Sequence, residues 1–121
     1  MTKILTKRTY DGSAPTDGYR ILVDRLWPRG LSHENFHYDL WEKNLAPSKE
    51  LREWFHADPE NRGAEFEKRY EDELRANPAF PEFVREVAKH PVVTFLYSSH
   101  DTEENNAIVL KKVVDNALAE K

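Results

Sequence analysis

Four side chains that can do chemistry lie within six positions of one another. Asp24, Arg25, Trp27 and Arg29 follow a run of β-favouring residues, where a strand should end and a loop begin. The proline and the glycine of the same stretch predict a stiff turn. Two guanidiniums can hold a phosphate or carboxylate through paired hydrogen bonds, and an indole can stack on a planar ligand. The stretch therefore predicts an anion-binding site, with Asp24 as the candidate catalytic base.

A second polar loop follows the most apolar stretch of the chain. Residues 92–97 form a continuous apolar run, typical of a strand buried on both faces, and Ser98 comes directly after it. Asn105 and Asn106 stand near the expected start of the last helix. Two successive asparagines there indicate either directed hydrogen bonds or ordinary tolerance at a helix start. Because ligands bind outside the carboxyl ends of parallel strands, we expect residues 98–106 to meet the first loop in one crevice.

The predicted ligand-binding set gains one more arginine, at the far end of the first expected strand. The set is Arg8, Arg25, Trp27, Arg29, Ser98, Asn105 and Asn106. Structural alternatives remain open for its members, since Trp27 can serve packing alone and Asp24 can form a buried ion pair with Arg25 or Arg29. His56 and His100 are further candidates, because histidine is the usual proton carrier near neutral pH.

Residues 33–37 read His-Glu-Asn-Phe-His and match the H-E-x-x-H motif of zinc proteases. In that motif a long helix brings two imidazoles to one metal ion, and a third protein ligand follows. Here Ser32 predicts only one or two helical turns through His37, after which an alternating pattern resumes. We therefore predict an exposed turn at this position, with no metal and no other cofactor.

Composition narrows the class of protein. The chain has 121 residues, no cysteine and a net charge of −4, so disulfides, thiolate nucleophiles and cysteine-based metal sites are excluded. Residues 1–30 carry a surplus of basic side chains on an otherwise acidic chain, which favours a small anionic ligand over nucleic acid. No apolar run approaches the roughly 20 residues of a membrane span, and no signal peptide is recognisable. We expect a cytoplasmic protein with no membrane partner and leave its oligomeric state open.

The hydrophobic pattern predicts one α/β domain over residues 1–121, a small three-layer or two-layer sandwich with a short, mostly parallel sheet. Strands are expected at residues 4–10, 19–24 and 92–97, with a short strand or extended segment at 40–45. Helices are expected at residues 48–58, 62–76, 81–90 and 103–119. The loop at residues 11–18 is too short for a crossover between parallel neighbours. The first two strands are therefore antiparallel neighbours, or parallel and not adjacent.

Several strings of residues carry a family resemblance. They include L-V-D-R-L-W-P-R-G at residues 22–30, L-R-E-W-F at 51–55 and N-N-A-I-V-L at 105–110. Together they resemble the YeaO-like branch of the domain-of-unknown-function 488 family over nearly the whole chain. The resemblance implies a small cytoplasmic protein of bacteria or archaea, in a family with no settled activity. Asn106 stands where many relatives carry histidine, so a scheme that needs an imidazole there does not apply.

Two classes of function fit the predicted crevice. The first is an enzyme that performs acid–base hydrolysis or transfer on a phosphorylated or nucleotide-like substrate, with Asp24 as the base. The second is a non-catalytic module that senses a metabolite or docks an acidic or nucleic-acid partner. A carboxyl group with a perturbed pKa in the crevice would favour the enzyme, whereas a flat, solvent-open arginine patch would favour the module.

Overall fold

A computed structural model describes residues 2–100 and 105–120. Its elements are β1 (Lys3–Arg8), η1 (Thr9–Asp11), η2 (Pro15–Asp17), β2 (Tyr19–Leu22), β3 (Leu40–Trp41), η3 (Lys43–Leu45), α1 (Lys49–Ala57), α2 (Pro59–Ala76), α3 (Phe80–Ala88), β4 (Val92–Tyr97) and α4 (Asn106–Ala119). The strands form one sheet in the order β1-β4-β2-β3, and every pair is parallel. The predicted α/β class is therefore confirmed.

β4 is an interior strand of the sheet, as its unbroken apolar sequence predicted. It pairs with β1 on one side and with β2 on the other, so the first two strands are parallel and not adjacent. Gly18 makes the entry into β2 possible, because it has a φ of +66° and a Cβ there would lie 2.3 Å from the Val92 carbonyl oxygen. Only glycine lets the chain approach β4 this closely.

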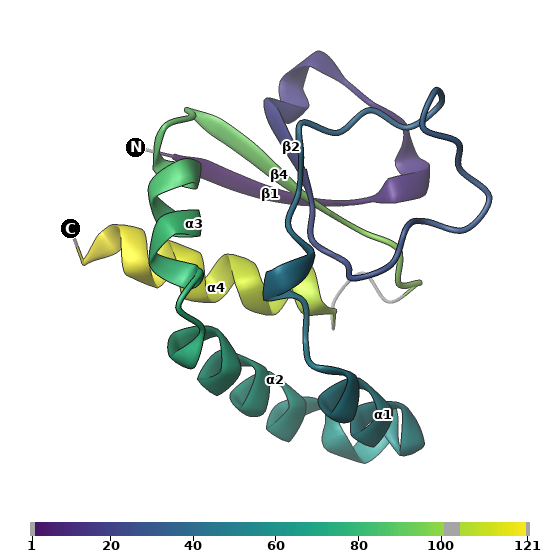
Figure 1. Ribbon diagram of the computed structural model, residues 1–121, viewed down its shortest axis with the longest axis vertical. Coiled ribbons are helices and arrows are strands. Elements are labelled where there is room, and N and C mark those ends of the chain that lie inside the picture. The colour runs from purple at the N-terminus through teal and green to yellow at the C-terminus, as the bar shows by residue number, and fades with distance from the viewer. Residues whose placement is uncertain (1, 101–104, 121) are drawn as a thin grey trace.

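The helices cover one face of the sheet, and in Figure 1 α1, α2 and α4 lie below the strands. Ile21, Val23 and Phe95 alternate toward that face and share one core with side chains from all four helices. On α2 the buried side chains are Phe66, Tyr70 and Leu74, spaced by four positions along a charged helix. Of the two arrangements expected, the protein therefore has the two-layer one.

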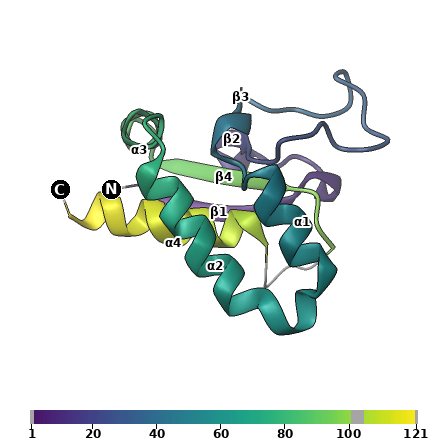
Figure 2. The same ribbon diagram turned by 60° about the horizontal axis from the view of Figure 1, so that its bottom comes forward.

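A loop rather than a helix covers the other face. Residues 23–39 connect β2 to β3, and in Figure 2 this segment stands apart from the helices. Its apolar side chains pack on Leu22 and Leu96 of the sheet. The cluster, which we call the aromatic cluster, contains Leu22, Trp27, Leu31, Phe36, Tyr38, Trp41 and Leu96. A loop rich in aromatic side chains thus takes the place of a third layer.

Some predicted boundaries are wrong. The second strand ends at Leu22 rather than at position 24: the Val23 amide still donates to the Leu96 carbonyl at 3.1 Å, and a bend follows at residues 24–26. Residues 32–37 form a turn and no helix, with the Asn35 amide donating to Ser32 Oγ at 3.1 Å. The last helix begins at Asn106, with Asn105 as its N-cap, and the predicted start at 103 lies outside the described residues. No described helix is both long and apolar enough to cross a bilayer.

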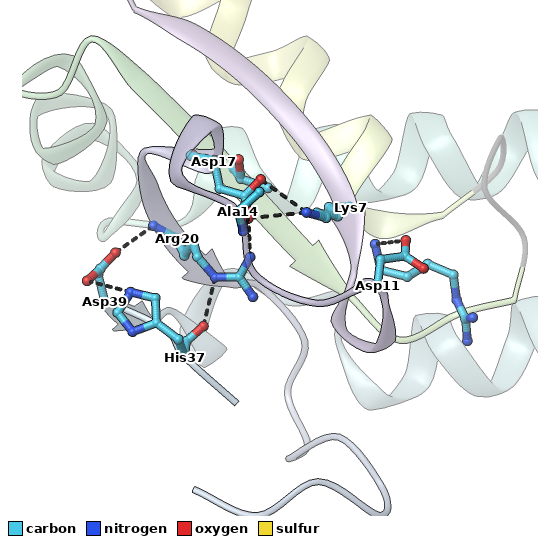
Figure 3. A network of polar contacts seen from close by, with 9 residues as sticks. Lys7, Asp11, Ala14, Asp17, Arg20, His37 and Asp39 are labelled. Atoms are coloured by element: carbon cyan, nitrogen blue, oxygen red, sulfur yellow. Dashed lines mark hydrogen bonds and ion pairs between the residues drawn. The ribbon is translucent and has the colours of Figure 1, made fainter. Parts of the chain in front are cut away.

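A buried ionic network fixes the connection between β1 and β2 (Figure 3). Asp17 is 5% exposed and accepts hydrogen bonds from the Ala14 amide at 3.0 Å, from Lys7 Nζ at 3.2 Å and from the Arg20 guanidinium. Arg20 is itself buried, and its Nε donates to the His37 carbonyl at 2.8 Å. Burial works to raise the pKa of Asp17, but these hydrogen bonds outweigh it and hold the pKa below its ordinary value.

We expect Asp17→Asn to lower the free energy of unfolding by about 3 kcal/mol, because it leaves the buried Arg20 without its counter-ion. Urea unfolding at neutral pH measures the loss. Asp115→Asn is the matched control, since Asp115 pairs with Lys111 at 2.8 Å on the exposed side of α4, and its loss should stay under about 1 kcal/mol. Equal losses in the two variants would contradict a structural role for the network.

Candidate functional site

The two predicted loops lie side by side, and the carboxylate of Asp24 joins them. Asp24 Oδ2 accepts a hydrogen bond from the Ser98 amide at 2.9 Å, at the end of β4. Its Oδ1 accepts one from Asn106 Nδ2 at 2.9 Å, at the start of α4. The backbone carbonyl of Asp24 also accepts from Trp41 Nε1 at 2.7 Å. The expectation that residues 24–30 and 98–106 are neighbours is thus confirmed by direct contacts between their described residues.

The surroundings of Asp24 perturb its ionisation. Burial raises the pKa of its carboxyl group, while the hydrogen bonds from Asn106 and Ser98 and the positive charge of Arg52 lower it in part. The net result is a pKa above its ordinary value of 3.8. Asp24 is therefore a carboxylate held by hydrogen bonds in a place where its charge is disfavoured.

Arg25 and Arg29 do not provide the counter-ion of Asp24. The Arg25 guanidinium donates to the Pro47 carbonyl at 3.3 Å, and the side chain of Arg29 is exposed. The hydrogen bonds of the Asp24 carboxylate come from Ser98 and Asn106. The alternative of a buried ion pair within residues 24–30 is therefore wrong. Both arginines instead line a cavity between these loops and α1.

Trp27 has a packing role. Its Nε1 donates to the Leu31 carbonyl at 2.6 Å, its ring stacks on His33 at a centroid distance of 3.9 Å, and it meets Trp41 edge-on at 5.6 Å. These contacts build the aromatic cluster on the sheet face. Trp27 also lines the crevice, so its use as a wall for a ligand stays a prediction.

Arg8 lies beside the crevice and holds its second loop. The Arg8 Nε donates to the Ser99 carbonyl at 2.9 Å and its Nη2 to the Ser98 carbonyl at 3.2 Å, while the guanidinium lies 5.0 Å from the centre of the Tyr10 ring. Arg8 is not among the described residues that line the cavity. Its guanidinium therefore supports the loop of Ser98 from the side.

The sequence left two alternatives for Asn105 and Asn106, directed hydrogen bonds or tolerance at a helix start, and the two residues differ in this respect. Asn105 is buried and its side-chain oxygen accepts from the Ile108 amide at 3.0 Å, which is an N-cap contact. Asn106 instead sends its amide to Asp24, and at 3.3 Å also toward the Val23 carbonyl. Asn105 therefore starts the helix, and Asn106 makes the directed hydrogen bond.

Between the loops and α1 lies a cavity of about 540 Å³. It brings together most of the predicted ligand-binding set, along with His56 and His100. The predicted residues that line it are Asp24, Arg25, Trp27, Arg29, Ser98, Asn105 and Asn106. We call this cavity the crevice, and the exposed residues Tyr10, Arg25, Leu26 and Arg29 of its lining the mouth of the crevice.

Sequence reasoning missed Arg52 of α1, which also lines the crevice. Its Nε atom is buried and has no hydrogen-bond partner among the described residues. Arg52 precedes two other lining residues, Phe55 and His56, by three and four positions, so all three share one face of α1. That spacing was visible in the sequence. What was not visible is that this face turns toward Asp24.

Comparison with known proteins identifies the family. The family described as the inactive DUF488-N3 subclade matches residues 3–121. The chain belongs to this subclade. It is 42% identical to the uncharacterized protein YeaO of Escherichia coli over 107 residues, which cover 88% of this chain and 92% of that one. It is 39% identical to the uncharacterized protein Rv3073c of Mycobacterium tuberculosis over 114 residues, which cover 94% of this chain and 95% of that one. No solved structure matches the chain.

The H-E-x-x-H string of this subclade member does not have the geometry of a zinc protease. His33 stacks on Trp27, whereas His37 Nε2 lies 3.5 Å from Asp39 Oδ1 and its carbonyl accepts from Arg20. The segment is a turn, so the two imidazoles do not share one face of a helix. Among residues 2–100 and 105–120, no group of three or more histidine, aspartate or glutamate side chains is placed so that it could hold a metal ion.

Asp24→Asn should change how the stability of this subclade member depends on pH. Because the folded protein holds the Asp24 proton more tightly than the unfolded chain, the contribution of this group is fully present below a pH of 3.8 and is lost as the pH rises through the folded pKa. The parent should therefore gain stability relative to Asp24→Asn as the pH falls from about 7 toward about 4. Urea unfolding across this range measures the difference. A difference that does not vary with pH would contradict the raised pKa.

Proposed function

We propose that this protein is a non-catalytic module that binds a small anion in the crevice. The ligand is a phosphate, a carboxylate or a nucleotide-like molecule. The observation that carries the proposal is the guanidinium of Arg52, which makes no hydrogen bond and no ion pair with any described residue while its Nε is buried. A buried donor left without a partner costs about 1–3 kcal/mol, and native proteins rarely tolerate one without a reason.

An anionic ligand would supply the missing partner. Asp24 is near enough for the charge of Arg52 to lower its pKa, yet its oxygens accept from Ser98 and Asn106 instead. With Arg25 and Arg29, the described lining carries three guanidiniums against one carboxylate. This local excess of positive charge, on a chain of net charge −4, supports an anion held in one place. The planar fork of arginine suits phosphate and carboxylate oxygens.

The lack of catalysis rests on how Asp24 is held. Each of its two oxygens already accepts a hydrogen bond that ties a loop or a helix in place. Using the carboxylate as a base would compete with the hydrogen bonds that join the loop of Asp24 to the end of β4 and to the start of α4. The description of the subclade as inactive supports the same conclusion.

An acid–base hydrolase is the second candidate, and the raised pKa of Asp24 favours it, since active sites often hold such carboxyl groups. The two candidates differ in turnover. A hydrolase would release phosphate from phenyl phosphate, and Asp24→Asn would abolish the release. The binding module should release none at any pH between about 5 and about 8, the range in which general bases usually operate.

Arg52→Gln should abolish the response to anions while leaving the fold intact. Phosphate at about 100 times its dissociation constant should stabilise the parent by about 2.7 kcal/mol, and Arg52→Gln should lose most of this gain. Without phosphate the variant should stay folded with a stability close to that of the parent, because it removes an unpaired, partly buried charge but also the positive charge that favours ionised Asp24. Thermal and urea unfolding with phosphate, sulfate or acetate at constant ionic strength measure both effects.

Arg85→Gln is the matched control for Arg52→Gln, because Arg85 is exposed on α3 and does not line the crevice. It removes the same charge and should keep the full anion response. Arg29→Ala, at the mouth, should keep the stability and lose only part of the response. If the parent shows no anion-specific stabilisation, or if the two glutamine variants respond alike, the proposed function is wrong.

A further inference from the structure

One side of the crevice is apolar. Phe55 of α1 and Phe66 of α2 lie with ring centroids 4.5 Å apart and form part of the wall. Ala46 and Pro47, which precede α1, continue it. A phosphate or sulfate ion has no apolar surface to place against these side chains. The crevice therefore has an apolar wall that a bare anion would leave without contacts.

The mouth of the crevice also carries apolar side chains, beside its two arginines. Leu26 is 67% exposed and Tyr10 is 42% exposed, and across residues 2–100 and 105–120 these are the two exposed large apolar side chains. Both line this one crevice. Folding leaves Leu26 uncovered between the two arginines of the mouth, although covering a leucine side chain is worth about 1.5–3 kcal/mol. Two exposed apolar side chains at the entrance of one cavity mark a surface that a ligand covers.

The position of Tyr10 is set by the protein itself. Its hydroxyl donates to the Arg29 carbonyl at 2.9 Å, and the Arg8 guanidinium lies 5.0 Å from the centre of its ring. The ring is therefore held at the mouth rather than left to move through solvent. A ring positioned in this way can contact an aromatic ligand at little further cost in side-chain entropy.

The size of the crevice agrees with an organic ligand. Its volume of about 540 Å³ falls within the range of roughly 300–1,000 Å³ that is typical of small-molecule sites. A bare phosphate ion fills only a minor part of that space. The charged group of Arg52 would bind an anionic part of the ligand, and the apolar walls would contact an apolar part of the same molecule.

We infer that the ligand carries its negative charge on an aromatic body: the anionic group binds Arg52 in the crevice, and the ring lies against Phe55 and reaches Leu26 and Tyr10 at the mouth. This inference rests on the proposed function and names the class of ligand. A nucleoside monophosphate and a simple aryl phosphate share this chemistry. Leu26 becomes a residue that sets specificity for the ring, and Arg52 the residue that binds the anion.

The test is isothermal titration calorimetry of the full chain with inorganic phosphate, phenyl phosphate and uridine 5′-monophosphate. Phenyl phosphate should bind at least about tenfold more tightly than inorganic phosphate, because covering one exposed leucine accounts for about tenfold in affinity. Leu26→Ser should lower the affinity for phenyl phosphate by about fivefold and leave the affinity for inorganic phosphate unchanged. Leu26 is exposed, so this variant should fold like the parent. Arg52→Gln should lower the affinity for both phosphates.

The outcomes separate this inference from the proposed function. Equal affinity for phenyl phosphate and inorganic phosphate would overturn the aromatic body and leave the anion site standing. No binding of any phosphate would overturn both. If phenyl phosphate binds more tightly than inorganic phosphate, the inference is supported, and the affinity of uridine monophosphate relative to phenyl phosphate then tells a nucleobase from a simple aryl ring. If a trinucleotide bound more than about tenfold more tightly than the mononucleotide, the partner would be a nucleic-acid strand and the inference would fail.

Discussion

The hydrogen bonds of Asp24 are the constraint on which the site depends. One carboxylate lies between the end of β2, the first residue after β4 and the first residue of α4. In an open parallel sheet, these are the places where the chain leaves the core and where backbone groups lose their ladder partners. The Asp24 carboxylate accepts a hydrogen bond from the Ser98 amide and at the same time one from the side chain of Asn106, which it orients. These hydrogen bonds join the two loops that line the crevice.

A carboxylate in this position carries a cost, since burial opposes its charge. The protein offsets that cost with two hydrogen bonds and with the nearby charge of Arg52, but it does not complete an ion pair. The guanidinium therefore remains available, partly buried and unpaired among the described residues. The ion pair of Asp17 and Arg20, which lies outside the crevice, is the opposite case, because each of its charges has partners and the pair serves the fold. Asp17 thus belongs to a structural ionic network, whereas Asp24 lines a candidate binding site.

The sheet also has two unequal faces, and this asymmetry shapes the site. Helices cover one face, and a loop with aromatic side chains covers the other. Trp27 belongs to both the cover and the crevice, so the loop that completes the core also presents Leu26 and the arginines on either side of it to solvent. Leu26 is left exposed although the next residue, Trp27, packs on the sheet within the aromatic cluster.

Local patterns in the sequence determined the elements and much of the site. The apolar run at residues 92–97 predicted the interior strand β4, the spacing of Phe66, Tyr70 and Leu74 predicted the buried stripe of α2, and the order of strands and helices predicted the class. They also indicated that residues 24–30 would meet residues 98–106, because parallel strands end at one edge. Each of these features depends on neighbours in sequence or on a general rule of sheet topology. For that reason one sequence was sufficient to predict them.

Only the tertiary structure decided which charges pair. The sequence left Asp24 a choice of arginines within its own loop, yet its partners come from residues more than 70 positions away. It did not single out Arg52, because a helical arginine beside charged residues looks like any solvated one until the packing of α1 turns it toward the crevice. It did not assign Arg20 to Asp17, or Trp27 to the aromatic cluster, since these contacts depend on how the long loop lies on the sheet. Charge pairing and burial depend on the summed positions of many elements, whereas strand and helix formation depend mainly on a few adjacent residues.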